Sequence, residues 1–472
     1  MSAILNGEVS HWMRSASPRR YHSPLPDERQ DLLIVGAGLT GLWAAYFAAK
    51  EHPDWKITVV EAKRVGYEAS GRNGGWMSTL LPGNRAVWAK RVNKQGGDGI
   101  AAMREFQQAV NASIHEALDI MRREGIDAGQ AQGGNLHVAQ TPAGYARLKG
   151  KYETDLRYGY SPEDIRLLDA EETRERINVD GALGSLHYQH TTAVDPARMV
   201  AGLAEAVDRL GVRICEETAA TRVEKQHVLT NRGPVIANTI FVCAEAATGK
   251  IESALPGFGP REVIPVNSSI IATETLPERF WKRIGWDERD CLMDSAHTFI
   301  YAQRTQDDRI AIGGRGTPYF FGSKLTGEGE VDERTIRSLR QKLAQLFPGE
   351  TLPIAHAWRG SIGVTRDWCA GLFFDRESRV GVVRGYAGHG VSSTLLAAKT
   401  LLDRAEGRST ELVRMPWNDH RAKKWEPEPI RWLGVHTMYR LFEYADAQEA
   451  RSGKPKTSLI AQFGSRLAGL HE

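Results

Sequence analysis

Two segments of the chain place an apolar strand pattern directly before a glycine-rich turn and a helix pattern. In the first, the apolar run 32–35 meets three glycines, and apolar residues then recur at helical intervals as far as residue 49. A second apolar run, 57–60, follows, so this segment predicts a strand–helix–strand unit. In the other, the strand pattern 379–383 leads into GYAGHGVSSTLLAAKTLLD, which predicts a helix that begins at a glycine-rich turn.

The rest of the chain alternates between helical and strand periods. Helix periods cover 98–125, 195–211, 336–346 and, near the C-terminus, about 431–446. Strand periods cover 133–139, 212–214, 221–224 and 240–244, and the region 262–325 alternates in the manner of antiparallel strands. This order predicts an α/β protein, α+β overall, in which a Rossmann-type domain is discontinuous and an antiparallel-sheet substrate domain is inserted into it.

The expected domain boundaries follow from these periods. The dinucleotide-binding domain takes 30–90 plus 190–260 plus 355–410, and the substrate domain takes 91–189 plus 261–354. Residues 1–29, rich in Pro, Arg and Ser, are expected to form an irregular N-terminal arm over the first domain, and 411–472 a C-terminal helical tail.

The first glycine turn has the composition of a dinucleotide site. Gly36, Gly38 and Gly41 have the G-x-G-x-x-G spacing, in which the glycines allow a tight turn, close approach of a pyrophosphate and close packing of helix on strand. The helix that follows offers free N–H groups and a positive dipole end to the phosphates. Glu61 stands twenty residues after Gly41, where a carboxylate accepts hydrogen bonds from a ribose hydroxyl and disfavours a 2′-phosphate.

Two further glycine-rich stretches suit contact with a planar ligand. EASGRNGGW follows the first unit, and its small residues leave the backbone accessible. The turn with Gly385, Gly388 and Gly390 opens a helix directly after a strand, which makes it a second candidate anion- or ring-binding site. Ordinary glycine-rich loops remain the alternative for both stretches.

Composition restricts the function mainly by exclusion. The 61 Lys and Arg residues against 58 Asp and Glu give a net charge of +3, which predicts no nucleic-acid partner. The four cysteines are far apart in sequence, which favours reduced thiols in a cytoplasmic protein, and we expect no metal site. No apolar run approaches the ~20 residues of a membrane span. Because no nucleophile, zinc or phosphate-loop motif occurs, we expect a dinucleotide cofactor to carry the chemistry.

An ordered set of motifs resembles a known family over about residues 30–410. The motifs are GAGLTGL with Glu61, EASGRNGG, GGNLHVA, AVDPARM, IPVNSSIIATE, YAQRTQDDRIAIGG, W-R-G at 358–360 and GYAGHGVS. Together they resemble the FAD-dependent D-amino-acid-oxidase superfamily, in its amine and glycine oxidase branch. Within that branch the chain is similar to the groups of gamma-glutamylputrescine oxidoreductases and aminophosphonate oxidases.

The resemblance implies a glutathione-reductase-like FAD domain and a set of FAD-binding residues. These are Gly36, Ala37, Gly38, Leu39, Thr40 and Gly41 at the pyrophosphate, Glu61, Ala62 and Lys63 at the ribose, Val223 and Ala244 on the adenine side, and Ser70, Gly71, Arg72, Asn73, Gly74, Gly75, Gly388, His389, Gly390, Val391 and Ser392 around the isoalloxazine. It also implies hydride transfer from a small primary or secondary amine to flavin N5, followed by hydrolysis of the imine. An amino acid, a polyamine derivative or an aminophosphonate would fit, with oxygen or another electron acceptor.

One departure from the family bears on how the flavin is held. Members that link flavin covalently carry a cysteine shortly before a Thr-x-Asp segment. Here Thr365-Arg366-Asp367 is present, but Gly360 stands at roughly that place and Cys369 lies after it. We therefore predict non-covalent FAD.

Substrate-side candidates follow from position alone. Trp76 and Met77 follow the flavin loop, Tyr301, Gln303 and Arg304 lie on a predicted strand, and Arg315 and Tyr386 adjoin glycine motifs. An arginine fork at 304 or 315 would pair with a substrate carboxylate or phosphonate. The alternatives are surface ion pairs for the arginines and core packing for the two aromatic residues at 76 and 386.

Two other functions remain open on sequence. A 2-hydroxy-acid or glycerol-phosphate-type dehydrogenase shares the FAD architecture, and a non-catalytic flavin-binding scaffold would retain the same motifs. A simple NAD enzyme is disfavoured because EASGRNGG and GYAGHGVS have no role in it.

Overall fold

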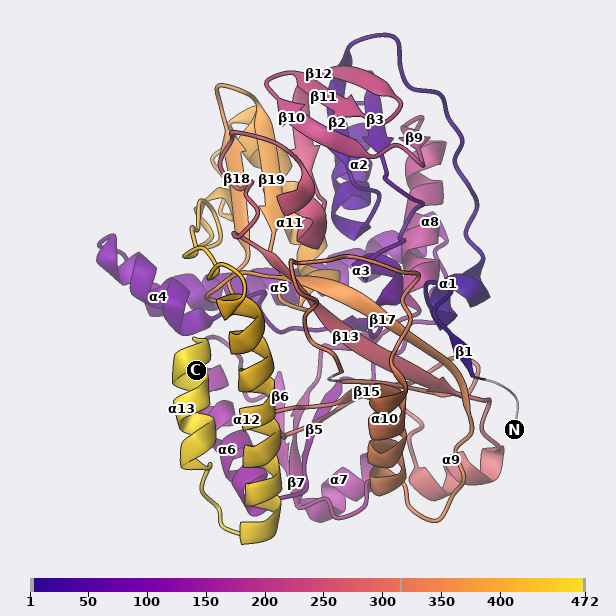
Figure 1. Cartoon of the computed structure of the whole chain (residues 1–472), viewed down its shortest axis with the longest axis vertical. Helices are drawn as coiled ribbons and strands as arrows, with labels where there is room; N and C mark the ends of the chain where they lie inside the picture. The colour runs from indigo at the N-terminus through magenta and orange to yellow at the C-terminus, as the bar shows by residue number, and fades with distance from the viewer. Residues whose placement is uncertain (1–3, 315, 470–472) are drawn as a thin grey trace.

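The computed structural model describes residues 4–314 and 316–469 and is organised around two large sheets (Figure 1). The sheet that contains the first glycine turn lies in the upper half of this view, and the larger sheet lies below it. The predicted mixed fold, a Rossmann-type half and a half built on a mainly antiparallel sheet, is confirmed.

The upper sheet has eight strands among the described residues. Its parallel part runs in the order β9–β3–β2–β12–β19, β18 pairs antiparallel with β19, and β10 and β11 form an antiparallel meander on β12. The strands are β2 (Gln30–Val35), β3 (Ile57–Val60), β9 (Arg213–Cys215), β10 (Ala220–Glu224), β11 (His227–Thr230), β12 (Gly233–Val242), β18 (Gly371–Asp375) and β19 (Val380–Arg384). Three distant segments of the chain therefore build one sheet, as the interrupted pattern predicted.

The run of apolar residues in β2 reflects burial of both faces of this sheet. Successive side chains of a strand point to opposite faces. Leu32 and Ile34 pack into the core that contains the helices, whereas Leu33 and Val35 pack into the core beneath the β10–β12 meander. The helices on the first side are α2 (Leu39–Glu51), α4 (Arg85–Lys94), α5 (Gly99–Glu124), α8 (Pro196–Arg209) and α11 (Gly390–Glu406).

The lower sheet has nine strands in the described part of the chain, in the order β1–β17–β13–β16–β15–β14–β5–β7–β6. Only the β1–β17 and β14–β5 pairs are parallel. The strands are β1 (Leu5–Asn6), β5 (Asn135–Ala139), β6 (Ile165–Leu168), β7 (Gly184–Tyr188), β13 (Ile264–Thr273), β14 (Cys291–Asp294), β15 (Tyr301–Arg304), β16 (Ile310–Gly314) and β17 (Ile354–Val364). One face packs on α9 (Glu278–Ile284) and α10 (Glu333–Leu346), and part of the other meets the upper half through Ile270 and Trp358.

Several further elements complete the two halves. They are α1 (His11–Ala16), α3 (Ala69–Arg72), α6 (Pro142–Arg157), α7 (Ala170–Arg176), the 3₁₀ helices η1 (Glu245–Lys250) and η2 (Leu412–Arg414), and the two-stranded pair β4 (Trp76–Met77) and β8 (Thr192–Ala193). The tail forms α12 (Ile430–Ser452) and α13 (Leu459–Ala468), which lie side by side in Figure 1 and are in contact. Within the described ranges, no helix is long and apolar enough to cross a membrane.

Two segments sit in a different half from the one that the periods suggested. β17 lies almost wholly within the stretch 355–410 but belongs to the lower sheet, because it pairs with β13 along almost its whole length. α5 lies within 91–189, yet its apolar stripe packs in the core of α2 and α11. Periodicity identifies a helix or strand but does not say which sheet receives it.

The N-terminal arm is more regular than its composition suggested. β1 adds a strand to the edge of the lower sheet beside β17, and α1 follows it. The Ser10 side chain caps α1 by accepting a hydrogen bond from the Met13 N–H at 3.0 Å. The arm therefore contacts both halves of the molecule.

Candidate active site

Each glycine of the first turn is required by the space around it. Gly36 has a φ of +108°, and a Cβ there would lie 2.7 Å from the carbonyl oxygen of Cys243. A Cβ on Gly41 would lie 1.9 Å from the carbonyl oxygen of Gly36, so α2 packs directly on the turn that precedes it. A Cβ on Gly38 would lie 2.8 Å from the Ser70 hydroxyl oxygen. The turn therefore presents bare backbone at the N-terminus of α2, which suits a pyrophosphate.

Ser70 and Glu61 place polar groups at either side of this turn. The Leu39 N–H donates to the Ser70 hydroxyl oxygen at 2.9 Å, which brings the second glycine loop against the start of α2. Glu61 follows β3 and accepts hydrogen bonds from the N–H groups of Ala37 and Lys63, both at 2.9 Å. Burial raises the pKa of Glu61 to about 7, while the two N–H donors act in the opposite direction. Hydroxyl groups of a ribose would supply further donors to this carboxylate.

Four successive carbonyl groups of the loop 71–74 each accept a hydrogen bond from a distant side chain. The hydroxyl of Ser10 donates to the carbonyl of Gly71 at 2.6 Å, and the indole N–H of Trp358 donates to that of Arg72 at 3.0 Å. The indole N–H of Trp12 donates to the carbonyl of Asn73 at 2.9 Å. The amide of Gln303 donates to the carbonyl of Gly74 at 2.7 Å. The arm, β15 and β17 therefore fix the shape of the loop together.

The second glycine turn is held by Glu245, which the sequence patterns did not single out. This carboxylate accepts hydrogen bonds from the N–H groups of Gly385 at 2.7 Å, Tyr386 at 3.1 Å and Gly363 at 3.2 Å. Burial raises the pKa of Glu245 to about 7 against the lowering effect of these donors. The only sequence signal was an acidic residue shortly after an apolar strand, which is the position that Glu61 occupies after β3.

A cavity that is partly open to solvent lies between the glycine loops and the lower sheet, with a volume of about 990 Å³ when the open space at its mouth is included. Its aromatic lining consists of Trp76, Phe299, Tyr301, Trp368 and Tyr439. The rings of Trp76 and Tyr301 meet edge to face, with centroids 6.0 Å apart, and the Tyr301 hydroxyl is 2.7 Å from that of Ser268. The remaining lining comes from Ala69, Arg72, Asn73, Gly74, Val266, Asn267, Ser268, Gly314, Gly360, Ser361, Ile362, Ala387, Gly388, His389 and Val391.

Several predicted substrate-side residues lie elsewhere. The guanidinium of Arg304 donates to Asp308 at 2.8 Å and lies 4.2 Å from the ring centroid of Trp281, on the side of the sheet away from the cavity. Met77 is fully buried in the helical core. The side-chain amide of Gln303 donates its hydrogen bond to the Gly74 carbonyl, so Gln303 positions the loop and does not line the cavity. Arg315 falls outside the described residues.

Tyr386, Ser392 and Val223 lie outside the cavity lining, and their expected roles in binding stay predictions. Tyr386 is buried and its hydroxyl is 3.1 Å from that of Thr40, so it ties the two glycine turns together and does not line the cavity. Ser392 donates to the Ser78 carbonyl at 2.6 Å and is likewise buried. The Val223 side chain is in the meander core and its N–H donates to the Glu252 carbonyl at 2.9 Å; a contact of Val223 with adenine stays a prediction. Ala244, by contrast, lies beside Gly36.

The arrangement fits FAD at the level of donors and free space. The glycine turns leave room that any side chain would fill, the α2 N-terminus and Glu61 suit a diphosphate and a ribose, and the loop 71–75 borders the cavity. None of the four cysteines lines this cavity, whereas Gly360 does. Cys369 is buried, with its thiol 3.5 Å from the Asp367 carbonyl.

Comparison with known proteins agrees with this geometry. A family model described as FAD dependent oxidoreductase matches residues 31–404. The probable oxidoreductase OrdL of Rhizobium meliloti (strain 1021) is 30% identical over 421 residues, covering 85% of this chain and 89% of that protein. Gamma-glutamylputrescine oxidoreductase of Escherichia coli (strain K12) is 28% identical over 386 residues, covering 80% and 84%. The solved structure of glycine oxidase from Geobacillus kaustophilus superimposes with a TM-score of 0.69 at 19% identity, covering 84% of this chain and 99% of that one.

Replacing Gly41 by alanine is expected to abolish FAD binding. The added Cβ would lie 1.9 Å from the Gly36 carbonyl oxygen, so α2 must move away from the pyrophosphate turn. Overpacking of this kind costs about 1–3 kcal/mol of folding stability. Flavin content per chain after purification is the measurement. Gly150→Ala is the matched control, because nothing lies within 4 Å of its Cβ position on α6; equal flavin content in both variants would contradict the assignment.

Replacing Trp12 by phenylalanine tests whether the arm positions the flavin loop. The ring remains but the hydrogen bond to the Asn73 carbonyl is lost, which costs about 0.5–1.5 kcal/mol. We expect the dissociation constant of FAD, measured by titrating apoprotein, to rise by up to about tenfold. Trp55→Phe is the control, since this indole stacks on His52 with centroids 3.8 Å apart. An unchanged dissociation constant in the Trp12 variant would show that the bond has no such role.

Denaturation is expected to release the flavin. Because no cysteine lines the cavity, precipitation with acid should leave all yellow colour in the supernatant and none on the chain. Absorbance of the separated fractions is the measurement. Colour that sediments with the polypeptide would overturn the prediction of non-covalent binding.

Proposed function

This chain belongs to the family of FAD-dependent oxidoreductases, and from that premise we propose that it oxidises a small primary or secondary amine. The observation that carries the proposal is the aromatic-lined cavity, which is bordered on one side by the flavin loop at Gly74 and on another by the turn at Gly388. A substrate in this cavity would therefore contact the reactive part of the cofactor. The names of two similar proteins, gamma-glutamylputrescine oxidoreductase and glycine oxidase, support an amine as the substrate.

The side chains around the cavity are suited to orienting an amine rather than to strong acid or base catalysis. Among the described residues the lining contains no Asp, Glu, Lys or Cys. Its ionisable side chains are Arg72, His389 and two tyrosines, and its other polar groups are mainly hydroxyls and amides. When bound, FAD supplies the two-electron acceptor that removes hydride from the carbon next to nitrogen, and water then hydrolyses the imine. The rings of Trp76 and Tyr301 would pack against the substrate and help to fix the carbon next to its nitrogen. The amine would react as the neutral free base, because an ammonium nitrogen has no lone pair with which to form the imine.

Hydrogen bonds from three distant side chains hold the loop 71–74 in a fixed position beside the cavity. The hydrogen bonds from Trp12, Gln303 and Trp358 hold the loop 71–74 from outside, so its inner surface is available to the cofactor. Tyr301 crosses the same loop, because a Cβ on Gly74 would lie 2.7 Å from its ring. Tyr301, which would contact the substrate, is therefore in direct contact with the loop that would contact the cofactor. This contact favours a fixed distance between the reacting groups.

The class of amine is the finer part of the proposal. An amino acid, a polyamine derivative and an aminophosphonate each remain candidates. Arg315 follows Gly314, which lines the cavity, and a role for Arg315 in holding a carboxylate or phosphonate stays a prediction. We also propose a reducing, cytoplasmic setting, because all four cysteines are free thiols.

Anaerobic mixing of the holoenzyme with a panel of amines is expected to bleach the visible flavin absorption. The panel contains short alkylamines, glycine and other amino acids, putrescine derivatives and 2-aminoethylphosphonate, with 2-hydroxy acids and glycerol phosphate as the contrast. Bleaching by an amine alone supports the proposal, and admission of air afterwards shows whether oxygen reoxidises the flavin. Bleaching only by hydroxy compounds would select a hydroxy-acid or glycerol-phosphate dehydrogenase, and no bleaching by either set would favour a flavin-binding scaffold.

A further inference from the structure

The C-terminal tail contributes to the cavity although it lies outside the matched family region. That region ends at residue 404, and α12 and α13 follow it. In Figure 1 both helices stand beside α6 in the lower half of the molecule, with the upper end of α12 near the middle of the view. Tyr439, on α12, is one of the aromatic residues that line the cavity.

Apolar packing continues from the cavity wall into the tail. Val266 and Val364, from β13 and β17, form one cluster with Val435 of α12, and Ile362, Trp368 and Tyr439 pack against the same cluster. Three of these residues, Val266, Ile362 and Trp368, also line the cavity. The helix is thus packed against the cavity wall rather than standing apart from it.

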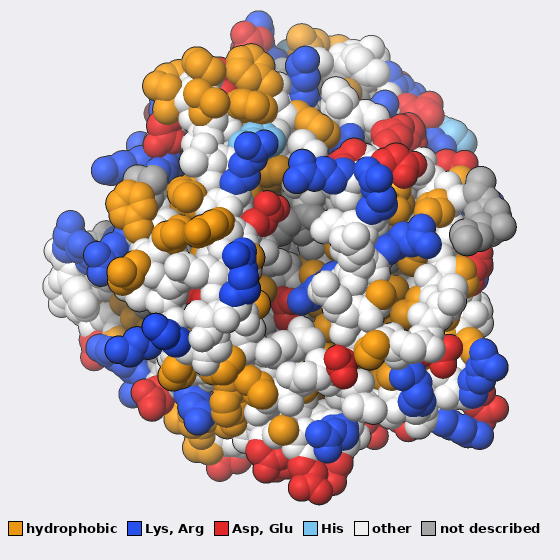
Figure 2. Space-filling view, turned by 60° about the horizontal axis from the view of Figure 1, so that its bottom comes forward, with side chains coloured by type: hydrophobic (Ala, Val, Ile, Leu, Met, Phe, Trp, Pro, Cys, Tyr) orange, Lys and Arg blue, Asp and Glu red, His pale blue; other side chains and the backbone are white. Residues whose placement is uncertain are grey.

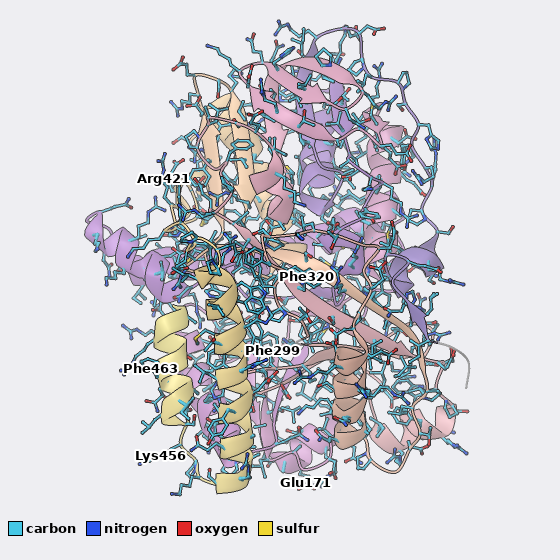
Figure 3. All side chains as sticks on the ribbon, viewed as in Figure 1. Glu171, Phe299, Phe320, Arg421, Lys456 and Phe463 are labelled. Carbon is cyan, nitrogen blue, oxygen red and sulfur yellow. The ribbon has the colours of Figure 1, made fainter. Side chains whose placement is uncertain are left out.

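Polar contacts hold the C-terminal half of α12 against the loop 295–299. Asp446 accepts hydrogen bonds from the N–H groups of His297 at 2.8 Å and Thr298 at 2.9 Å, and from the Thr298 hydroxyl at 2.6 Å. These residues come directly before Phe299, which lines the cavity and lies beside α12 in Figure 3. The anchor therefore couples the position of α12 to that of a cavity side chain.

A second anchor lies one turn further along the helix. Glu449 is 2% exposed and accepts hydrogen bonds from Arg147 at 2.6 Å and the Ser458 N–H at 2.8 Å. His297, Ser458 and Arg147 hold the pKa of Glu449 down, to about 2, against its burial. The tail is therefore attached to α6 and to the loop 295–299 by buried charge-assisted bonds, which are stronger than surface ion pairs.

Figure 2 shows a face of the molecule with a central hollow, around which lie hydrophobic side chains together with Lys or Arg and Asp or Glu side chains. The outer side of the tail also carries aromatic side chains. Tyr444 on α12 and Phe463 on α13 are 55% and 63% exposed, and Figure 3 shows Phe463 at the outer edge of the molecule. The same helix thus offers one tyrosine on the cavity and another in solvent, which makes an internal comparison possible.

We propose that α12 forms the roof of the substrate cavity and that Tyr439 sets the upper size limit of the substrate. The inference rests on the proposed amine oxidation for its substrate and names the part of that site that determines specificity. A phenol ring at the wall of a pocket excludes groups that would occupy its volume, and it keeps water from the reacting carbon. The substrate is accordingly a short amine whose chain ends against the ring of Tyr439.

The test compares Tyr439→Ala with Tyr444→Ala in the FAD-loaded enzyme. Using straight-chain primary amines of increasing length and benzylamine, we expect Tyr439→Ala to raise KM for the best short amine by about tenfold. We expect the same variant to lower KM for longer amines and benzylamine by a similar factor. Tyr439→Phe keeps the ring and should retain the profile of the natural enzyme, as should Tyr444→Ala. If the two alanine variants have the same length profile, Tyr439 does not set the limit.

A second measurement does not depend on turnover. Iodide quenching of bound-flavin fluorescence reports how open the cavity is to solvent. The quenching constant should rise in Tyr439→Ala and remain unchanged in Tyr444→Ala and Tyr439→Phe, with equal flavin content in all. An unchanged quenching constant in Tyr439→Ala would contradict the proposal that α12 covers the cavity. If no amine reduces the flavin of the natural enzyme, the proposed reaction is wrong. A raised iodide quenching constant in Tyr439→Ala would still support α12 as the roof of the cavity.

Discussion

The geometry of the reaction centre depends on four hydrogen bonds to the carbonyl groups of residues 71–74. Glycines at 71, 74 and 75 widen the range of backbone conformations open to this loop, although the side chains of Arg72 and Asn73 also bond to nearby backbone. Here Ser10, Trp358, Trp12 and Gln303 reach it from three distant segments and satisfy consecutive acceptors. A buried carbonyl without a donor is costly, so these bonds restrict the loop to one shape. They also join the arm and the lower sheet to the cofactor side of the molecule.

The local parts of this design are visible in the sequence. Strand, glycine turn, helix and Glu61 occur within one short segment, so spacing alone predicts them. The donors to the loop are not visible, because Trp12 and Trp358 are 346 residues apart and nothing in either surrounding stretch marks its partner. Glu245 was missed for the same reason, since its three N–H partners come from two later segments of the chain. Contacts between distant segments require the fold.

The prediction that Arg304 binds the substrate was wrong for another reason. The alternation of side chains along the predicted strand already placed Arg304 on the opposite face from Tyr301. Side chains alternate along a strand, so Tyr301 and Gln303 share one face of β15 and Arg304 belongs to the opposite face. The first two contact the glycine loop, whereas Arg304 lies over Trp281 on the far side. Met77 is the neighbour of Trp76 on β4 and is turned into the core by the same alternation. Proximity to a motif in sequence is weaker evidence than the face on which a residue stands.

The two glycine turns are coupled to each other as well as to the loop between them. Tyr386 follows the second turn's first glycine and its hydroxyl meets that of Thr40 on α2, so a shift of either turn breaks a buried contact. Glu61, after β3, and Glu245, after β12, add carboxylates that accept hydrogen bonds from the N–H groups of Ala37 and Gly385 respectively. Burying two carboxyl groups raises their pKa values and is unfavourable by itself. Glu61 and Glu245 lie beside the glycine turns, where bulky side chains would occupy the space needed by a cofactor. The hydrogen bonds that these two carboxylates accept therefore hold the turns in place of side-chain packing. The unfavourable free energy of burying these two carboxyl groups is therefore a consequence of keeping glycine-lined space in an otherwise close-packed interior.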